Sequence, residues 1–237
     1  MSEHLTFGPR IDGLLERLYV RNAAQDEALA AYFTERASDP GMNWRQFDDR
    51  TNDFLRDKLV ALDRAKAEFC YSLCRALRAR RVVEVGTSFG VSTIFLAAAV
   101  RDTARQDPGS DGPADLRPIV IGTEFETEKA TAARLHFEEA GLSDFIELRQ
   151  GDLLETLRDV DGPIDFVLMD IWASMARPAL ELVSSHLREG AVVICDNTEQ
   201  FREAYADYFE FIHDRRNAFR TMTLPFEGGL EFTVRAR

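Results

Sequence analysis

Cysteine and histidine are scarce in this chain of 237 residues, which holds three cysteines and four histidines. Cys70 and Cys74 lie one helical turn apart among apolar residues, so we interpret them as small buried side chains. No second pair of cysteine or histidine residues accompanies them at a metal-binding spacing. This scarcity argues against a zinc site.

Long hydrophobic runs and an excess of basic residues are also missing. No apolar stretch approaches membrane-spanning length, and the first residues, MSEHLTFGPRIDG, do not have the layout of a secretion signal, so we expect a cytoplasmic protein. The formal net charge of -12 argues against nucleic acid or an anionic membrane as a partner, because phosphate binding needs a basic surface. The composition is compatible with an enzyme that acts on a small molecule.

The length suits one α/β domain with additional N-terminal helices. We divide the chain into a helical extension, 1–62, which would cap the site or form a dimer contact, and a main domain, 63–237. Apolar periodicity predicts helices within 11–35, over 51–62 and over 65–78, and residues 102–118 have the composition of a solvated loop.

Short apolar segments alternate with helical patterns through the main domain. They predict strands within 81–85, 119–123, 145–148, 164–169 and 191–195, followed by two closing strands within 219–234. This alternation predicts a Rossmann-like, doubly wound sheet that is mostly parallel, with an antiparallel strand near the C-terminus.

Each of the five alternating strands is followed by a glycine, an acid, or an acid–amide pair. Ligands of such sheets bind outside the carboxyl ends of the strands, so we expect these residues to meet around one ligand. They are Gly86, Glu124, Gly151 with Asp152, Asp170, and Asp196 with Asn197.

The turn between the first strand and its helix carries two glycines, Gly86 and Gly90, with Glu84 two residues before the first. Glycine lets a ligand approach the backbone, and the N–H groups of the helix start near Ser92 favour a carboxylate or phosphate. A dinucleotide-binding turn needs G-x-G-x-x-G, which disfavours a nicotinamide-dependent dehydrogenase. The alternative is a tight turn without a ligand.

Glu124 and Asp152 have the chemistry to bind an adenosine. Glu124 could accept hydrogen bonds from both ribose hydroxyls, and Asp152 could accept one from an adenine amino group. Ser92 and nearby N–H groups could hold a carboxylate. A ligand that matches all three positions is an adenosine with an amino-acid tail. The alternatives are a solvated carboxylate at Glu124 and a helix cap at Asp152.

Asp170, Asp196 and Asn197 form a second candidate site. Three hard oxygen donors suit Mg²⁺ or Ca²⁺, and we expect a dication because the sequence offers these groups no basic partner. The alternative is that Asp196 caps the following helix and Asn197 bonds the loop.

From about residue 63 to 235 the chain resembles the cation-dependent O-methyltransferases, a class I S-adenosylmethionine-dependent group that includes the catechol and caffeoyl-CoA enzymes. The resemblance lies in VVEVGTSFGVST, IGTE, QGD, LMDIW, VICDN and GGLEFTV. It implies a homodimer that binds S-adenosylmethionine and Mg²⁺ or another divalent cation. The implied cofactor residues are Glu84, Gly86, Ser92, Glu124, Asp152, Asp170 and Trp172, with Trp172 against the adenine, and the implied metal ligands are Asp170, Asp196 and Asn197.

One position departs from the family pattern. The residue after the acid-x-Trp triplet is a lysine in the catechol type, where it takes the proton from the attacking hydroxyl, and here it is Ala173. We assign this role to no residue: the metal alone, Glu199 or an N-terminal histidine could serve, whereas Arg177 is a poor base. We expect O-methylation of a small catechol-like metabolite. The alternatives are methylation of nitrogen or protein, transfer without a metal, and cofactor binding without turnover.

Overall fold

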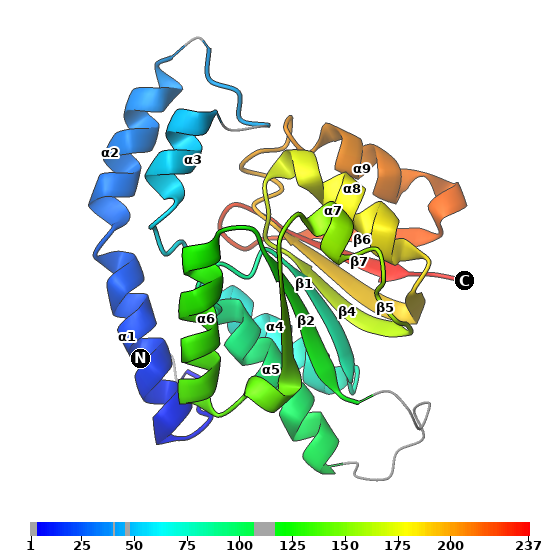
Figure 1. The fold of residues 1–237 in the computed structure, drawn as a ribbon. Helices are drawn as coiled ribbons and strands as arrows, with labels where there is room; N and C mark the ends of the chain where they lie inside the picture. The colour runs from blue at the N-terminus through cyan, green and yellow to red at the C-terminus, as the bar shows by residue number, and fades with distance from the viewer. Residues whose placement is uncertain (1–3, 40, 46–47, 107–116) are drawn as a thin grey trace.

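The computed structural model describes residues 4–39, 41–45, 48–106 and 117–237, and it contains one sheet between two layers of helices (Figure 1). Its strand order is β3-β2-β1-β4-β5-β7-β6, in which β7 runs antiparallel to both of its neighbours and β1 to β5 are parallel. This confirms the predicted fold class. The strands are β1 Arg81–Val85, β2 Ile119–Glu124, β3 Ile146–Gln150, β4 Ile164–Met169, β5 Leu187–Asp196, β6 Phe219–Leu224 and β7 Leu230–Arg235.

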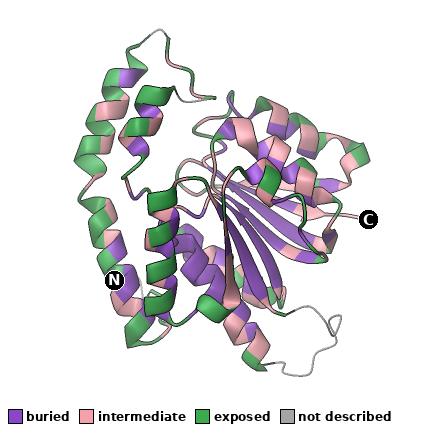
Figure 2. Cartoon of the chain, viewed as in Figure 1, coloured by how far each residue is buried: buried purple, intermediate pink, exposed green. Residues whose placement is uncertain are grey.

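The two faces of the sheet bury alternate residues of each strand. Val82 faces the layer of α4 (Arg64–Ala76), α5 (Val91–Gln106) and α6 (Thr127–Ala140), whereas Val83 and Val85 face α7 (Leu153–Thr156), α8 (Ala173–Ser184) and α9 (Ala206–His213). Figure 2 shows this arrangement as a buried sheet with buried inner helix surfaces. Two short 3-10 helices, Ser143–Phe145 and Arg215–Asn217, precede β3 and β6.

The N-terminal helices are α1 (Pro9–Ala23), α2 (Asp26–Ala37) and α3 (Asp49–Leu55), and α1 packs beside α6 (Figure 1). The buried residues of α1 are Ile11, Leu14, Leu15 and Leu18. Helices α2 and α3 are joined by the stacked rings of Tyr32 and Phe54, whose centroids are 3.8 Å apart.

Two predicted boundaries were wrong. The helix expected over 51–62 ends at Leu55, because side chains of the N-terminal helical segment bind backbone groups of residues 59–61 that a helix would use internally. The loop expected over 102–118 begins later, since α5 continues to Gln106 and Asp102 accepts a hydrogen bond from Tyr71 of α4 at 3.0 Å. Residues 107–116 of that expected loop lie outside the described residues.

The strand register brings the predicted rim together. Val85 pairs with both Thr123 and Met169, Met169 pairs with Cys195, and Glu124 pairs with Gln150. The parallel strands therefore end at one edge, and this confirms the common rim expected from the sequence. In the described part of the chain, no helix combines the length and apolar character needed to cross a membrane.

Candidate functional site

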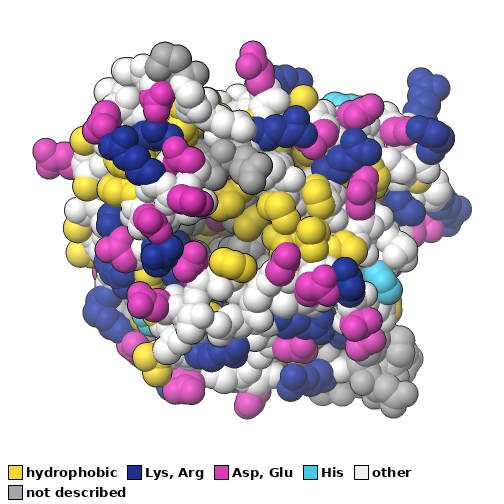
Figure 3. Space-filling view, turned by 45° about the horizontal axis from the view of Figure 1, so that its top comes forward, with side chains coloured by type: hydrophobic (Ala, Val, Ile, Leu, Met, Phe, Trp, Pro, Cys, Tyr) yellow, Lys and Arg dark blue, Asp and Glu magenta, His cyan; other side chains and the backbone are white. Residues whose placement is uncertain are grey.

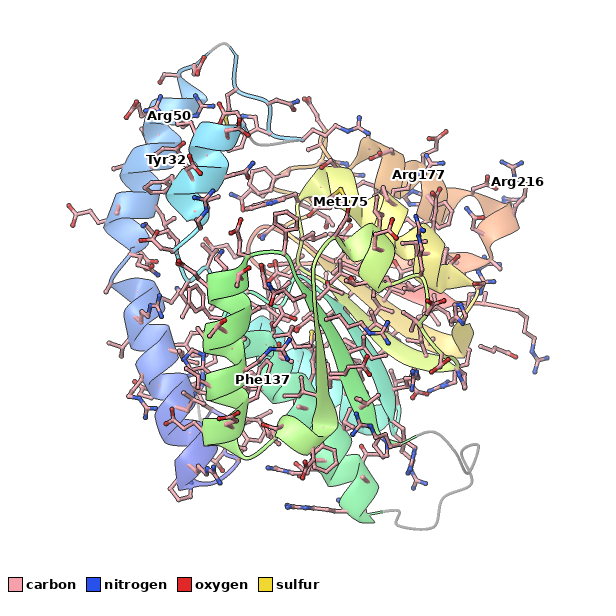
Figure 4. The ribbon with its side chains drawn as sticks, viewed as in Figure 1. Tyr32, Arg50, Phe137, Met175, Arg177 and Arg216 are labelled. Atoms are coloured by element: carbon pink, nitrogen blue, oxygen red, sulfur yellow. The ribbon has the colours of Figure 1, made fainter. Side chains whose placement is uncertain are left out.

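The glycine turn between β1 and α5 is shaped by close packing. Gly86 has φ +98°, and a Cβ atom there would overlap the carbonyl oxygen of Asp170. Gly90 has φ +85°, and a Cβ atom there would overlap the ring of Phe137, which comes from α6 (Figure 4). Both glycines are therefore required by the fold itself. Because they have no side chains, the turn leaves backbone groups accessible at the rim.

Glu84 is fully buried beneath this turn. Its carboxylate accepts hydrogen bonds from Thr87 Oγ1 at 2.9 Å, from Ser92 Oγ at 2.6 Å and from Thr93 Oγ1. Burial raises the pKa of Glu84, and the three hydroxyl groups oppose that rise by stabilising the charged form. Glu84 thus ties the turn to α5, which leaves backbone N–H groups rather than the Ser92 hydroxyl as candidate donors to a ligand carboxylate.

Glu124 lies at the end of β2, next to the glycine turn. Its Oε2 accepts a hydrogen bond from the backbone N–H of Ser88 at 2.7 Å, and its Oε1 accepts one from Glu126 N–H at 2.7 Å. Each carboxylate oxygen keeps a further lone pair. The side chain is held in place and retains the capacity to accept from a diol.

Asp152 and Trp172 occupy exposed positions at helix starts. Asp152 caps α7, where its Oδ1 accepts a hydrogen bond from Leu154 N–H at 2.9 Å, so the capping interpretation of this residue is confirmed. Gly151 N–H donates to the carbonyl of Glu124 at 2.9 Å and brings the end of β3 beside β2. Trp172 precedes α8 and is among the exposed hydrophobic residues. A role for either side chain against an adenine remains a prediction.

A narrow pocket lies between the glycine turn and residues 59–62, which we term the strap. The turn contributes residues 86–89 to its lining, and Val91, Ser92 and Asp170 complete that side. Tyr19, Asn22 and Gln25 hold the strap from the N-terminal helical segment. Gln25 Nε2 donates to the Leu59 carbonyl at 2.9 Å, Asn22 Oδ1 accepts from Ala61 N–H at 2.8 Å, and Tyr19 OH donates to the Leu62 carbonyl at 3.0 Å.

The ends of β4 and β5 carry a buried charge cluster that includes Lys66. Lys66 Nζ lies 2.6 Å from Asp196 Oδ1, and each side chain is 5% exposed. Burial, followed by the charges of Asp196 and Glu84, raises the pKa of Asp170 to about 8, and Lys66 opposes the rise. The expectation that these acids have no basic partner was therefore wrong.

A sequence signal for Lys66 did exist. Lys66, Cys70 and Cys74 are spaced by four residues on α4, and all three are buried. A lysine in register with two buried cysteines lies on the core-facing side of the helix, where it needs a buried acidic partner.

Two of the three predicted metal ligands, Asp196 and Asn197, already bond to each other, and Asp196 also bonds to Lys66. Asp196 Oδ1 accepts from Lys66, Asp196 Oδ2 accepts from Asn197 Nδ2 at 3.1 Å, and Asn197 Oδ1 lies against Gly228. Each oxygen of Asp196 thus accepts one hydrogen bond, and the Lys66 ammonium nitrogen lies 2.6 Å from Oδ1. This donor set, as arranged, does not fit a divalent cation, which needs several oxygens directed at one point.

Each candidate proton acceptor either lacks an acidic or basic group or has another partner. Ala173 is the buried first residue of α8, Glu199 is paired with Arg202, and Arg177 bonds Glu181 at 2.9 Å. His4 Nδ1 lies 3.2 Å from Glu68 Oε1. The general base thus remains unassigned.

Aromatic side chains connect the N-terminal helices with the segment after β5. The ring of Trp44 lies 6.0 Å from that of Phe33 and 5.7 Å from that of Phe201. The Arg45 carbonyl accepts from Ser174 N–H at 3.2 Å, and its side chain pairs with Asp207. Figure 3 shows hydrophobic side chains gathered in the middle of the face at the top of the molecule, and Figure 4 shows Met175 on α8 at the same end.

The chain is similar to known methyltransferases. A family model described as a methyltransferase domain matches residues 83–198. A catechol O-methyltransferase of Mycobacterium tuberculosis is 30% identical over 139 residues, which cover 58% of this chain and 57% of that protein. Catechol O-methyltransferase B of Danio rerio is 27% identical over 76% of this chain and 64% of its own length. The chain thus spans less than two thirds of each of these relatives.

Solved structures share the fold. An O-methyltransferase from Bacillus cereus in complex with SAH has a TM-score of 0.64 at 20% identity, covering 92% of this chain and 99% of that one. The O-methyltransferase TomG from Streptomyces achromogenes in complex with SAM has a TM-score of 0.64 at 20% identity, covering 81% of this chain and 92% of that one. Taken together, the matched methyltransferase domain, the curated catechol O-methyltransferases and the sheet topology show that the chain is similar to O-methyltransferases in sequence and in fold.

Proposed function

We propose that this chain transfers the methyl group of S-adenosylmethionine to an oxygen of a small hydroxylated metabolite. The observation that carries the proposal is the direct packing of Gly86 against Asp170. It places the glycine turn, with Glu124 beside it, next to the Asp170–Asp196 cluster at one rim of the sheet. A donor held by the turn would then face an acceptor held at the cluster.

The donor side uses groups that suit the parts of the cofactor. Backbone N–H groups of the turn and of the α5 start would bind the carboxylate, because helix starts favour negative charge. Glu124 would accept from the ribose hydroxyls, whereas Asp152, Asp170 and Trp172 are proposed around the rest of the nucleoside. Glu84 would act from below, by fixing the turn through its hydroxyl partners.

The acceptor side supports a flat aromatic substrate. A row of three aromatic rings connects the N-terminal helices with the segment after β5: Phe33, Trp44 and Phe201. Aromatic rings bind other rings through offset or edge contacts. We therefore propose a catechol-like substrate beneath residues 1–62, which would act as a cap, in a cytoplasmic homodimer.

The transfer is a displacement in which the bond between oxygen and the methyl carbon forms as the bond from that carbon to sulfur breaks. The electron pair of the broken bond goes to sulfur, and the proton of the substrate hydroxyl goes to solvent. The chain's contribution is to hold the two reactants in line and to exclude water from the pocket. The sequence-based prediction of a divalent metal remains untested, and we derive no step through it because the donor atoms do not fit one.

The test is incubation with methyl-labelled cofactor and a panel of catechols, each beside its dimethyl ether, in Mg²⁺ and in chelator. Transfer to catechols but not to the ethers supports the proposal. Ala173, at the position of the family lysine, favours a second candidate, which is methylation of nitrogen or protein, or binding without turnover. Equilibrium dialysis with S-adenosylmethionine and with NAD⁺ comes first, and retention of NAD⁺ alone would contradict both candidates.

A further inference from the structure

We propose that the ammonium group of Lys66 supplies the positive charge at the ends of β4 and β5, in place of a divalent cation, so that this site works without a metal ion. The inference deepens the proposed function, on which it rests only for the contact with substrate. The charge arrangement stands on the structure alone.

Lys66 is held rigidly at this place. It lies in the first turn of α4, whose N-cap, Asp63, accepts hydrogen bonds from the N–H groups of Ala65 and Lys66 at 2.9 and 3.3 Å. The cap fixes where the helix begins and therefore the direction in which the lysine side chain leaves it. Its Nζ reaches Asp196 at 2.6 Å, across 130 residues of sequence.

The ammonium group and a divalent cation would compete for the same oxygen. A dication bound through Asp196 Oδ1 would lie beside the buried ammonium, and like charges repel strongly where water is excluded. Binding it would require Lys66 to leave a buried ion pair, which strands a charge. Lys66 in place thus excludes the metal.

The orientation of Asn197 agrees with this assignment. Its side-chain amide donates an N–H group to Asp196 Oδ2. A metal ligand would instead direct the amide oxygen at the cation bound by Asp196. Asp196 therefore accepts from Lys66 through one oxygen and from Asn197 through the other. Because an ammonium has three donors, Lys66 retains capacity to hydrogen-bond a substrate oxygen and to stabilise its ionised form.

The decisive measurement is Mn²⁺ binding followed by electron paramagnetic resonance, which needs no turnover. We expect the wild-type protein to show no saturable site. Lys66→Met should gain one site per chain, because it leaves Asp170 and Asp196 without their cation, and Lys66→Met with Asp196→Asn should lose that site again. Lys66→Arg keeps a cation and should behave as wild type. Arg75→Met, at the far end of α4, is the matched control.

Saturable Mn²⁺ binding by the wild-type protein, abolished by Asp196→Asn, would overturn the proposal. Failure of a folded Lys66→Met protein to gain Mn²⁺ would also overturn the role given to Lys66, with folding checked by circular dichroism and Lys66→Gln as a second variant. In chelator, wild-type methyl transfer should be unchanged. A complete lack of transfer would count against the proposed function and leave the Mn²⁺ result standing.

Discussion

The carbonyl oxygen of Asp170 lies where the side chain of any residue other than glycine at position 86 would begin. This contact joins the turn after β1 to the end of β4, and Asp170 N–H also donates to the Val85 carbonyl at 3.0 Å. The donor side and the acceptor side of the rim are thus parts of one packed unit.

Gly86→Ala should destabilise the protein by about 2–4 kcal/mol, since the new Cβ would overlap backbone and the φ of +98° disfavours it. Thermal and denaturant unfolding would measure the loss. Gly13→Ala is the matched control: it lies inside α1, and its Cβ would meet Arg17 at 3.9 Å, so a gain of up to ~1 kcal/mol is expected. Equal stability of the two variants would contradict the packing argument.

Glu124→Gln should weaken binding of S-adenosylmethionine by about 10- to 100-fold. A carboxylate has two oxygens that can accept from the two ribose hydroxyls, and it accepts stronger hydrogen bonds than an amide, which has one oxygen. Isothermal titration calorimetry measures the change. The variant's unfolding must be followed too, since Glu124 also accepts from Ser88 and Glu126. Glu128→Gln, an exposed change on α6, should bind as wild type, and unchanged affinity in Glu124→Gln would remove the ribose role.

Gln25→Ala should make the strap more mobile and weaken cofactor binding, although Gln25 itself is not proposed to contact the cofactor. Gln25 forms hydrogen bonds with both the N–H and the carbonyl of Leu59, at 3.2 and 2.9 Å, and their loss should cost about 1–2 kcal/mol. Hydrogen exchange at the Leu59 amide should become faster, and the dissociation constant of S-adenosylmethionine should rise. Glu27→Ala on α2 is the control, and slow exchange in Gln25→Ala would contradict the assigned role.

The titration of the Asp170 carboxyl should lower the free energy of unfolding as the pH rises from about 4 to about 8. Burial raises its pKa from the ordinary 3.8 to about 8, so the folded protein keeps a proton that the unfolded chain releases. Asp170→Asn removes this group and should flatten the slope of unfolding free energy against pH, by at most ~1.4 kcal/mol per pH unit. Denaturant unfolding at several pH values, with exposed Asp159→Asn as the control, tests it; equal slopes would count against the shift.

Much of the fold was predictable because its signals are local. Val82, Val83 and Val85 before a glycine turn indicate a buried strand, and alternation of such strands with helices leads to a parallel sheet. The end of the helix at Leu55 was missed because side chains of the N-terminal helical segment, more than 30 residues away, decide it.

The sequence by itself determined which residues stand at the strand ends, from Gly86 to Asn197, because parallel strands of one sheet must finish on one rim. Only the tertiary structure decided what those residues contact. Asp152 caps a helix, Glu84 is enclosed by hydroxyls, and Lys66 lies against Asp196 from 130 residues away. The physical reason is that periodicity sets the face on which a side chain lies, whereas its partner depends on how separate elements pack.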